Sequence, residues 1–207
     1  MSMLNQIADQ KIVAVIRLDG LSKAVELSQA LLEGGVSILE FTLTNADAPQ
    51  AIKQVRKTLG DRIIVGAGSV ITSQQVDEVA DCGAQFVVSP VTKRDVIESC
   101  HKHQLPTMPG AYTPTEIQAA WEMDVAAVKV FPAAGLGVKY IKDVLAPLPH
   151  LRLIPTGGIT VNNIMDFVNV GVFAVGVGSA LFDKNALKAG DWDSIAHSAK
   201  KLCQAIK

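Results

Sequence analysis

The sequence predicts an α/β protein, a (β/α)₈ barrel with a short N-terminal helix. Apolar runs without alternation, typical of strands buried on both faces, take turns with helical patterns along the whole chain. Eight such units follow one another, and their short connections favour parallel neighbours. A doubly wound open sheet is the competing architecture, but residues 17–20 after the first strand read Arg-Leu-Asp-Gly instead of its glycine-rich turn. We expect residues 1–207 to form one barrel domain.

Each element has its own sequence signal. Leu4, Ile7 and Ala8 fit a short opening helix. Ser22 is the expected N-cap of the next helix, Gly34 is its expected end, and Thr113 is the expected cap of a later helix. The predicted strands are 12–16, 36–42, 63–65, 85–89, 106–108, 127–131, 151–155 and 173–177. The helices predicted after them are 23–32, 46–59, 73–81, 93–103, 114–121, 139–145, 161–170 and 194–206.

The composition predicts a large core and gives no sign of a nucleic-acid or membrane partner. Of the 207 residues, 49% are hydrophobic, 19% are charged and 5% are aromatic, with a net charge of -1. This offers neither a basic surface nor a base-stacking platform. No apolar run approaches the ~20 residues that cross a bilayer, and the first ten residues lack the apolar core of a signal peptide. Three widely spaced cysteines suit a reducing cytoplasm.

Polar residues and glycines gather at the ends of the predicted strands. In a barrel, the carboxyl ends of all strands lie on one face, where active sites are built. Residues from distant parts of the sequence should therefore surround one mouth. They are Arg17, Glu40, Thr42, Thr44, Gly68, Ser69, Ser89, Pro90, Pro109, Gly110, Lys129, Phe131, Pro132, Thr156, Gly157, Gly158, Gly176, Gly178 and Ser179.

One lysine, Lys129, stands inside the apolar strand 127–131. A lysine near a strand end can pack its stem and extend its ammonium group to water. Lysine is, however, rarely buried without a partner, and a desolvated lysine loses its proton more easily and becomes a nucleophile. Lys129 is therefore the candidate catalytic amine.

Glu40 likewise interrupts an apolar strand. It could form a structural ion pair with Arg17 on the adjacent strand, because a lone buried carboxylate is costly. A carboxylate near a Schiff-base lysine is also what proton transfer to and from a carbinolamine needs. The two roles are compatible, and we favour the catalytic one.

The loops after the seventh and eighth strands are rich in glycine, and they predict a phosphate site. Glycine lets backbone N–H groups approach an anion, and helix N-termini add favourable partial charge. A single glycine turn usually only makes a tight connection, but these two loops occupy the usual phosphate position of such barrels. Ser179 would add a hydroxyl donor. The residues concerned are Thr156, Gly157, Gly158, Gly178 and Ser179.

The histidines do not suggest a metal centre. They fall on predicted helix surfaces or in a loop, where we expect them to be solvated, and no cluster with His, Asp or Glu has metal-ligand spacing. We therefore expect neither a metal nor a cofactor. The four histidines are His101, His103, His150 and His197.

Seven strand-end segments carry a resemblance that runs from about Lys11 to the C-terminus. They are Leu39–Thr42, Gly66–Ser69, Val88–Pro90, Met108–Gly110, Val128–Pro132, Pro155–Gly158 and Gly176–Ser179. Together they resemble the KDPG/KHG aldolases, which act on 2-keto-3-deoxy-6-phosphogluconate (KDPG) and 4-hydroxy-2-oxoglutarate (KHG). The resemblance implies a carbon–carbon lyase that forms a Schiff base with a phosphorylated 2-keto acid, and homotrimers are common in the family. Because oxaloacetate can reach the same enamine, its decarboxylation is expected as well.

The resemblance also implies roles for single residues. Lys129 would form the Schiff base and Glu40 would be the general acid/base. Phe131 would pack beside the pyruvyl group, and Pro90 would belong to the same end of the site. The residues after the seventh and eighth strands would form the phosphate end.

The sequence departs from the family at the pyruvate end. Many relatives carry an arginine that holds the pyruvate carboxylate at the position of Thr44, and a threonine where Ser69 stands. Arg17 ends the neighbouring strand and can bring a guanidinium to the same carboxylate. We expect Arg17, Thr44 and Ser69 to position it, so the departure affects substrate choice more than reaction type.

Three alternatives stay open from the sequence. A 2-keto-3-deoxy-6-phosphogalactonate aldolase would use the same machinery with opposite stereochemistry at C4. A phosphate-binding barrel isomerase or epimerase would keep the glycine loops without needing Lys129 as a nucleophile. A non-catalytic ligand-binding barrel would tolerate the loss of Lys129 or Glu40, and both are present.

Overall fold

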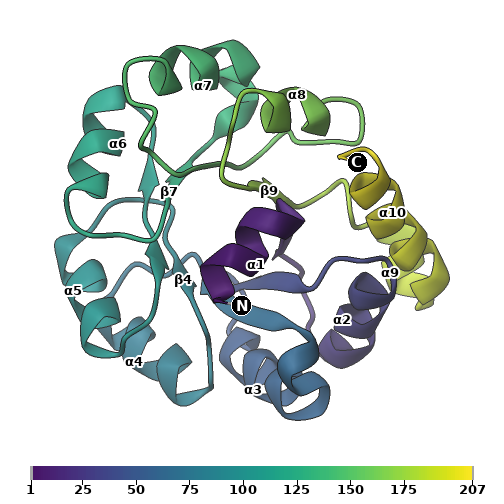
Figure 1. Cartoon of the computed structure of the whole chain (residues 1–207). Coiled ribbons are helices and arrows are strands. Elements are labelled where there is room, and N and C mark those ends of the chain that lie inside the picture. Colours follow the sequence, from purple (N-terminus) through teal and green to yellow (C-terminus); the bar gives the residue numbers. More distant parts are fainter. Residues whose placement is uncertain (1, 207) are drawn as a thin grey trace.

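Parallel strands form a closed barrel inside a ring of helices, as the alternation of the sequence predicts (Figure 1). The computed structural model describes residues 2–206. The strands are β1 (Ile12–Ile16), β2 (Ile38–Thr42), β3 (Ile64–Gly68), β4 (Val87–Val88), β5 (Thr107–Met108), β6 (Gly110–Ala111), β7 (Val128–Val130), β8 (Leu153–Pro155) and β9 (Val175–Val177).

The strands pair in two sheets that together close the ring. One sheet has the order β5-β4-β3-β2-β1-β9 and the other β6-β7-β8, and all registered pairs are parallel. β5 and β6 are two parts of one strand interrupted at Pro109, which has no N–H for the ladder. A parallel bridge between Thr156 and Gly176 joins the end of β8 to β9. The predicted barrel is thus confirmed, and the fifth strand extends past the predicted 106–108 because it resumes after the proline.

The helices follow the strands with ends that differ from the predictions by a few residues. They are α1 (Met3–Gln10), α2 (Ala24–Glu33), α3 (Ala48–Leu59), α4 (Ser73–Asp81), α5 (Arg94–Lys102), α6 (Pro114–Trp121), α7 (Gly137–Leu145), α8 (Ile164–Asn169), α9 (Lys184–Ala189) and α10 (Trp192–Gln204), with short 3₁₀ turns η1 (Gly60–Arg62) and η2 (Ala133–Gly135). Within residues 2–206, no helix has both the length and the apolar character to span a membrane.

Two details of the helices differ from expectation. Ser22 is not an N-cap: Ala24 N–H donates to Leu21 O in a turn, and α2 starts after Lys23 with no side-chain cap. α9 was not predicted, although the sequence contains a suitable N-cap residue, Asp183. In the structure its side chain accepts hydrogen bonds from the N–H groups of Asn185 and Ala186.

Helix α1 closes the N-terminal end of the barrel and lies across the middle of the ring (Figure 1). Its Ile7 is fully buried. Gln10 Oε1 accepts from the N–H groups of Ser37 and Ile38 at 3.0 and 3.1 Å, which fixes the helix to the start of β2. Ile7 packs in a cluster with Val13, Ile38, Ile64, Phe86, Val88, Met108, Ala127, Ile154 and Ala174. A substrate must therefore enter from the opposite, C-terminal end.

Candidate active site

Two buried charged side chains meet at the C-terminal end of the barrel. Glu40 on β2 is 3% exposed and Lys129 on β7 is 4% exposed, and Nζ of Lys129 lies 3.5 Å from Oε1 of Glu40. Their strands stand on opposite sides of the barrel, so both side chains reach across its interior. Within residues 2–206, Oε1 of Glu40 makes no hydrogen bond. Oε1 of Glu40 is thus a buried acceptor that faces the amine without a hydrogen bond to satisfy it, an arrangement often found at functional sites.

The alternative structural pairing of Glu40 with Arg17 is wrong. The buried carboxylate pairs with Lys129, and Arg17 is exposed on the loop after β1. Arg17 follows Val15, the residue in register with Glu40, by two residues and so lies nearer the mouth. Its guanidinium is therefore available to a ligand.

Phe131 borders the amine. Its ring centroid lies 5.2 Å from Nζ of Lys129, and the ring is half-buried. Lys129 N–H donates to Pro109 O and Phe131 N–H donates to Ala111 O, so both residues follow the ladder of the interrupted strand. Alternation in the ladder sets Lys129 and Phe131 on the same face. Phe131 thus lies beside Lys129, and its packing against a pyruvyl group stays a prediction.

A small cavity lies against the Glu40–Lys129 pair. Thr156, buried at the end of β8, also lines it, and its Oγ1 donates to Ile154 O at 3.3 Å. The side chain of Thr156 thus lies beside the Glu40–Lys129 pair while its backbone leads into the glycine turn, and its predicted place at the phosphate end stays a prediction. Gly176 makes room for it: a Cβ there would collide with the Thr156 hydroxyl. The other lining residues are Val13, Val88, Met108 and Ile154.

Arg17 and Thr44 come together in an open cleft at the mouth. Thr44 Oγ1 lies 2.8 Å from Thr42 Oγ1, which itself is 3.1 Å from Ile16 O. Thr44 is thus held by a hydroxyl chain that begins on β1. The cleft also includes Leu18, Asp19, Asn45 and Ala46.

Ser69 and Pro90 follow the neighbouring strands β3 and β4, and both are half-buried. Ser69 has a φ of 60°, the left-handed region that a residue with a side chain seldom adopts. Such strain costs about 1–3 kcal/mol and clusters at functional sites. Both residues stand at the same end of the barrel as Arg17 and Thr44, as the sequence predicts.

The two glycine loops lie at the same mouth. Gly157 and Gly158 have φ values of 99° and 74°, which glycine adopts without strain. Among residues 2–206, the N–H groups of Gly158 and Ser179 donate to no backbone carbonyl, whereas Gly157 directly follows the bridge between Thr156 and Gly176. α8 and α9 begin at Ile164 and Lys184, a few residues after these loops, and a contribution of their N-termini to anion binding stays a prediction. An anion here would be held by loop amides and the Ser179 hydroxyl.

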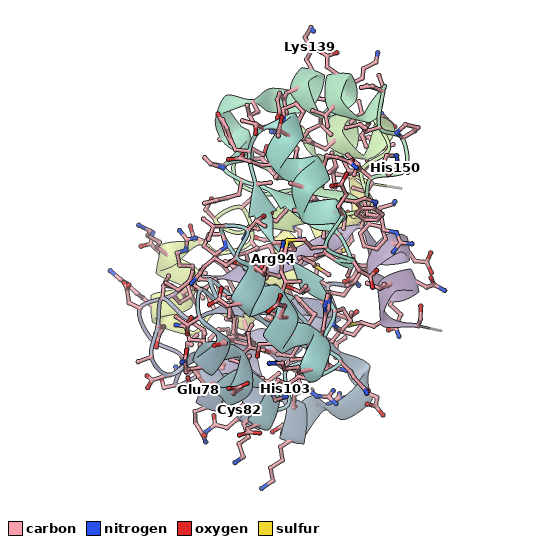
Figure 2. All side chains as sticks on the ribbon, turned by 90° about the vertical axis from the view of Figure 1, so that its left-hand side faces the viewer. Glu78, Cys82, Arg94, His103, Lys139 and His150 are labelled. Carbon is pink, nitrogen blue, oxygen red and sulfur yellow. The ribbon has the colours of Figure 1, made fainter. Side chains whose placement is uncertain are left out.

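The histidines are surface residues, as expected. All four are exposed, and Figure 2 shows His103 and His150 on the outside of the helical ring. His103 Nε2 lies 2.7 Å from Asp77 Oδ1, and this hydrogen bond lowers the pKa of Asp77. Among residues 2–206, no group of three or more His, Cys, Asp or Glu side chains is arranged to hold a metal ion.

Comparison with known proteins shows which family the chain is similar to. The family model described as KDPG and KHG aldolase matches residues 3–198. The 2-dehydro-3-deoxy-phosphogluconate aldolase of Haemophilus influenzae is 34% identical over 205 residues, which cover 99% of this chain and 96% of that protein. The KHG/KDPG aldolase of Escherichia coli K12 is 36% identical over 198 residues, covering 95% and 92%.

A solved structure extends the similarity to the fold. The KDPG aldolase of Legionella pneumophila, crystallised with pyruvate captured as a covalent carbinolamine intermediate, superposes with a TM-score of 0.89 at 30% identity over 97% of both chains. The predicted resemblance and the predicted enzyme class are confirmed. The chain belongs to the KDPG/KHG aldolase family and is an aldolase, a carbon–carbon lyase.

Proposed function

We propose that the protein cleaves KDPG to pyruvate and glyceraldehyde 3-phosphate through a Schiff base on Lys129. The observation that carries this proposal is a buried amine 3.5 Å from a buried carboxylate at the open end of the barrel. Burying a charged pair is costly, and hydrophobic replacements of similar volume are often as stable. The pair is thus better explained by reactivity than by stability. The covalent carbinolamine captured in the Legionella relative supports the same chemistry.

In the proposed mechanism, the neutral amine of Lys129 attacks the C2 carbonyl carbon, and Glu40 supplies and removes the protons that convert the carbinolamine to a protonated imine with loss of water. Glu40 then takes the proton of the C4 hydroxyl. The C3–C4 bond breaks, its electron pair moves into the imine to give an enamine, and the aldehyde leaves. Protonation at C3 and hydrolysis by water release pyruvate and the free amine.

The remaining predicted residues would hold the two ends of the substrate. Arg17, Thr44 and Ser69 would bind the carboxylate next to C2, and Pro90 and Phe131 would border the pyruvyl group. The amides of Gly157 and Gly158, together with Gly178 and Ser179, would bind the phosphate. Thr156, beside the reacting pair, would contact the substrate near C4. Positioning of this kind can lower a barrier by ~7–11 kcal/mol at best.

Borohydride reduction in the presence of pyruvate tests the proposal directly. We expect a mass increase corresponding to one reduced pyruvyl group, located on Lys129 by peptide mapping. Lys139 is a matched control: it projects from α7 (Figure 2), its Nζ lies 2.6 Å from Asp143 Oδ2, and it is exposed. Lys139→Ala should label as the wild type does, and Lys129→Ala should not label. An adduct on another lysine would contradict the proposal.

The same enamine leads us to propose action on KHG and metal-independent decarboxylation of oxaloacetate. The oxaloacetate imine loses CO₂, and the electrons of that bond give the enamine that aldol cleavage also produces. No hydroxyl proton is removed in this step, so Glu40→Gln should reduce aldol cleavage more than decarboxylation. Pyruvate release with a chelator present, corrected for the spontaneous rate, measures it. Cleavage assays with KDPG and its C4 epimer separate this function from that of a phosphogalactonate aldolase.

We further propose that the enzyme is a cytoplasmic homotrimer, on the family resemblance. Exposed apolar side chains support an interface at the catalytic end: Ile71, Val91 and Tyr112, in the loops after β3, β4 and β6, are 44%, 47% and 42% exposed. Lys93 Nζ donates to Ile71 O at 2.8 Å and so ties two of these loops together. Light scattering coupled to size-exclusion chromatography measures the mass, and Val91→Lys should weaken association.

A further inference from the structure

A glycine next to Glu40 occupies a position that no side chain could share. Gly66 and Gly68 lie two residues apart on β3, so they face the same side of the barrel wall. A Cβ on Gly68 would collide with Oε1 of Glu40 and lie 2.6 Å from both its Cδ and Cγ. The end of the Glu40 side chain therefore fills the space above Gly68.

The backbone at Gly68 does not itself require glycine. Its φ lies outside the left-handed region, unlike that of Gly157 or Gly158. Glycine inside a strand weakens the strand, because it has no side chain to pack and loses more conformational freedom on folding. What glycine provides here is space for the carboxylate.

We propose that Gly68 is a positioning residue for the acid/base group: the absence of its side chain lets the Glu40 carboxylate lie 3.5 Å from Nζ of Lys129. This inference rests on the proposed function, in which Glu40 moves the protons. The atoms that an alanine would meet belong to the flexible end of Glu40, and a cavity lies against Glu40. In Gly68→Ala the carboxylate therefore moves toward that cavity while the backbone keeps its place.

The same strand offers a matched control. A Cβ on Gly66 would lie 2.5 Å from three atoms of the Phe86 ring, which is fully buried in the apolar cluster at the closed end. Gly66→Ala thus collides with a core ring and Gly68→Ala with a catalytic carboxylate. Gly20→Ala is a neutral control, because Gly20 is exposed, its φ lies outside the left-handed region, and a Cβ there would meet nothing within 4 Å.

The experiment measures kcat, KM, the pH profile of kcat and the melting temperature for each variant. Gly68→Ala should lower kcat by about a hundredfold, the effect of misplacing a catalytic group by about 1 Å, with little change in KM. Its pH profile should shift, because Glu40 leaves its contact with Lys129. Gly66→Ala should mainly lower the melting temperature, and Gly20→Ala should change neither kcat nor the melting temperature.

A double-mutant cycle shows whether Gly68 acts through Glu40. In the Glu40→Ala background there is no carboxylate to displace, so adding Gly68→Ala should not slow borohydride trapping of pyruvate further. The same fold loss in both backgrounds would overturn the proposal, as would a Gly68→Ala enzyme with wild-type kcat. If Gly68→Ala does not fold, the double variant should regain the melting temperature of Glu40→Ala, and its failure to do so would also overturn the proposal.

The outcome also separates this inference from the function on which it rests. A wild-type enzyme that gives no pyruvate adduct on Lys129 contradicts the proposed function. An adduct in the wild type together with full activity in Gly68→Ala contradicts only the role of Gly68.

Discussion

The two ends of the barrel are built from the same strands, and their inward-facing residues differ sharply. Three pairs of residues, each two positions apart, show the difference, with the apolar member nearer α1 and the polar member nearer the mouth. They are Ile38 and Glu40, Ala127 and Lys129, and Ile154 and Thr156. Residues two apart on a strand share a face. The layer near α1 is an apolar cluster, and the next layer toward the mouth carries the charged and hydroxyl groups.

The difference separates stability from reactivity along a single axis. Burial of the apolar layer under α1 stabilises the fold, whereas burial of the Glu40–Lys129 pair costs free energy because both groups lose their hydration. Strand geometry fixed by the first layer positions the side chains of the second. Changes in one layer should therefore affect stability, and changes in the other should affect catalysis.

The largest expected effect is at Lys129. Lys129→Ala should lower KDPG cleavage by at least about 10⁴-fold, because the covalent route loses its nucleophile. The fold should persist, since the apolar strand keeps its neighbours. Steady-state rates and circular dichroism measure the two properties. A variant with substantial turnover would break the assignment of reactivity to this layer.

At the closed end, Ile38→Ala tests the opposite property. Ile38 is fully buried two residues before Glu40. Truncation should cost about 2–5 kcal/mol in the free energy of unfolding, through lost burial and the cavity left behind. Urea denaturation measures that loss, and kcat of the folded fraction should stay within a few-fold of wild type. A hundredfold fall in kcat at full folding would show that the layers are coupled.

The sequence was most informative where a strand is a continuous apolar run. β1 was predicted to the residue, and the lysine and glutamate that interrupt such runs proved to be partners in space. The favoured placement of Glu40 beside Lys129 depended on the predicted barrel, because Arg17 is the nearer residue along the chain and only closure of the barrel brings Lys129 opposite. α9 is too short to show a clear apolar period. The role of Gly68 depends on where one Glu40 rotamer lies, and no pattern in the sequence encodes that.

Ser179→Asp tests the phosphate end of the open layer. The new carboxylate would stand beside the loop amides that we expect to hold the phosphate, so KM for KDPG should rise by about 30-fold, equivalent to about 2 kcal/mol of like-charge repulsion. KHG lacks a phosphate and should be affected much less. Equal losses for both substrates would mean that these loops are only turns.

Arg17→Met tests the carboxylate end with a smaller expected effect. Losing a charged hydrogen-bond partner at an exposed position should weaken pyruvate trapping about tenfold. Because Thr44 lines the same cleft, adding Thr44→Arg should restore part of the affinity. Unchanged pyruvate affinity in Arg17→Met would remove Arg17 from the site.

The smallest expected effect concerns hydrogen bonds from backbone N–H groups to a side-chain oxygen, which occur at both ends of the barrel. At the open end, Glu116 accepts from the N–H groups of Thr113 and Tyr112 at 2.8 and 2.9 Å, and these bonds lower the pKa of Glu116. At the closed end, Gln10 accepts in the same way from Ser37 and Ile38. Only the carboxylate titrates.

A depressed folded-state pKa contributes stability above the unfolded-state pKa, and that contribution is lost as pH falls through the lowered value. Acidification should therefore loosen the loop before α6 first. In hydrogen exchange corrected for intrinsic rates, the amides of Tyr112 and Thr113 should lose protection at pH values below the ordinary titration range of glutamate. The amides of Ser37 and Ile38 should keep their protection at the same pH. Glu116→Gln should remove the pH dependence. Parallel loss at both ends would indicate global acid unfolding, and the two ends would then not respond to pH independently.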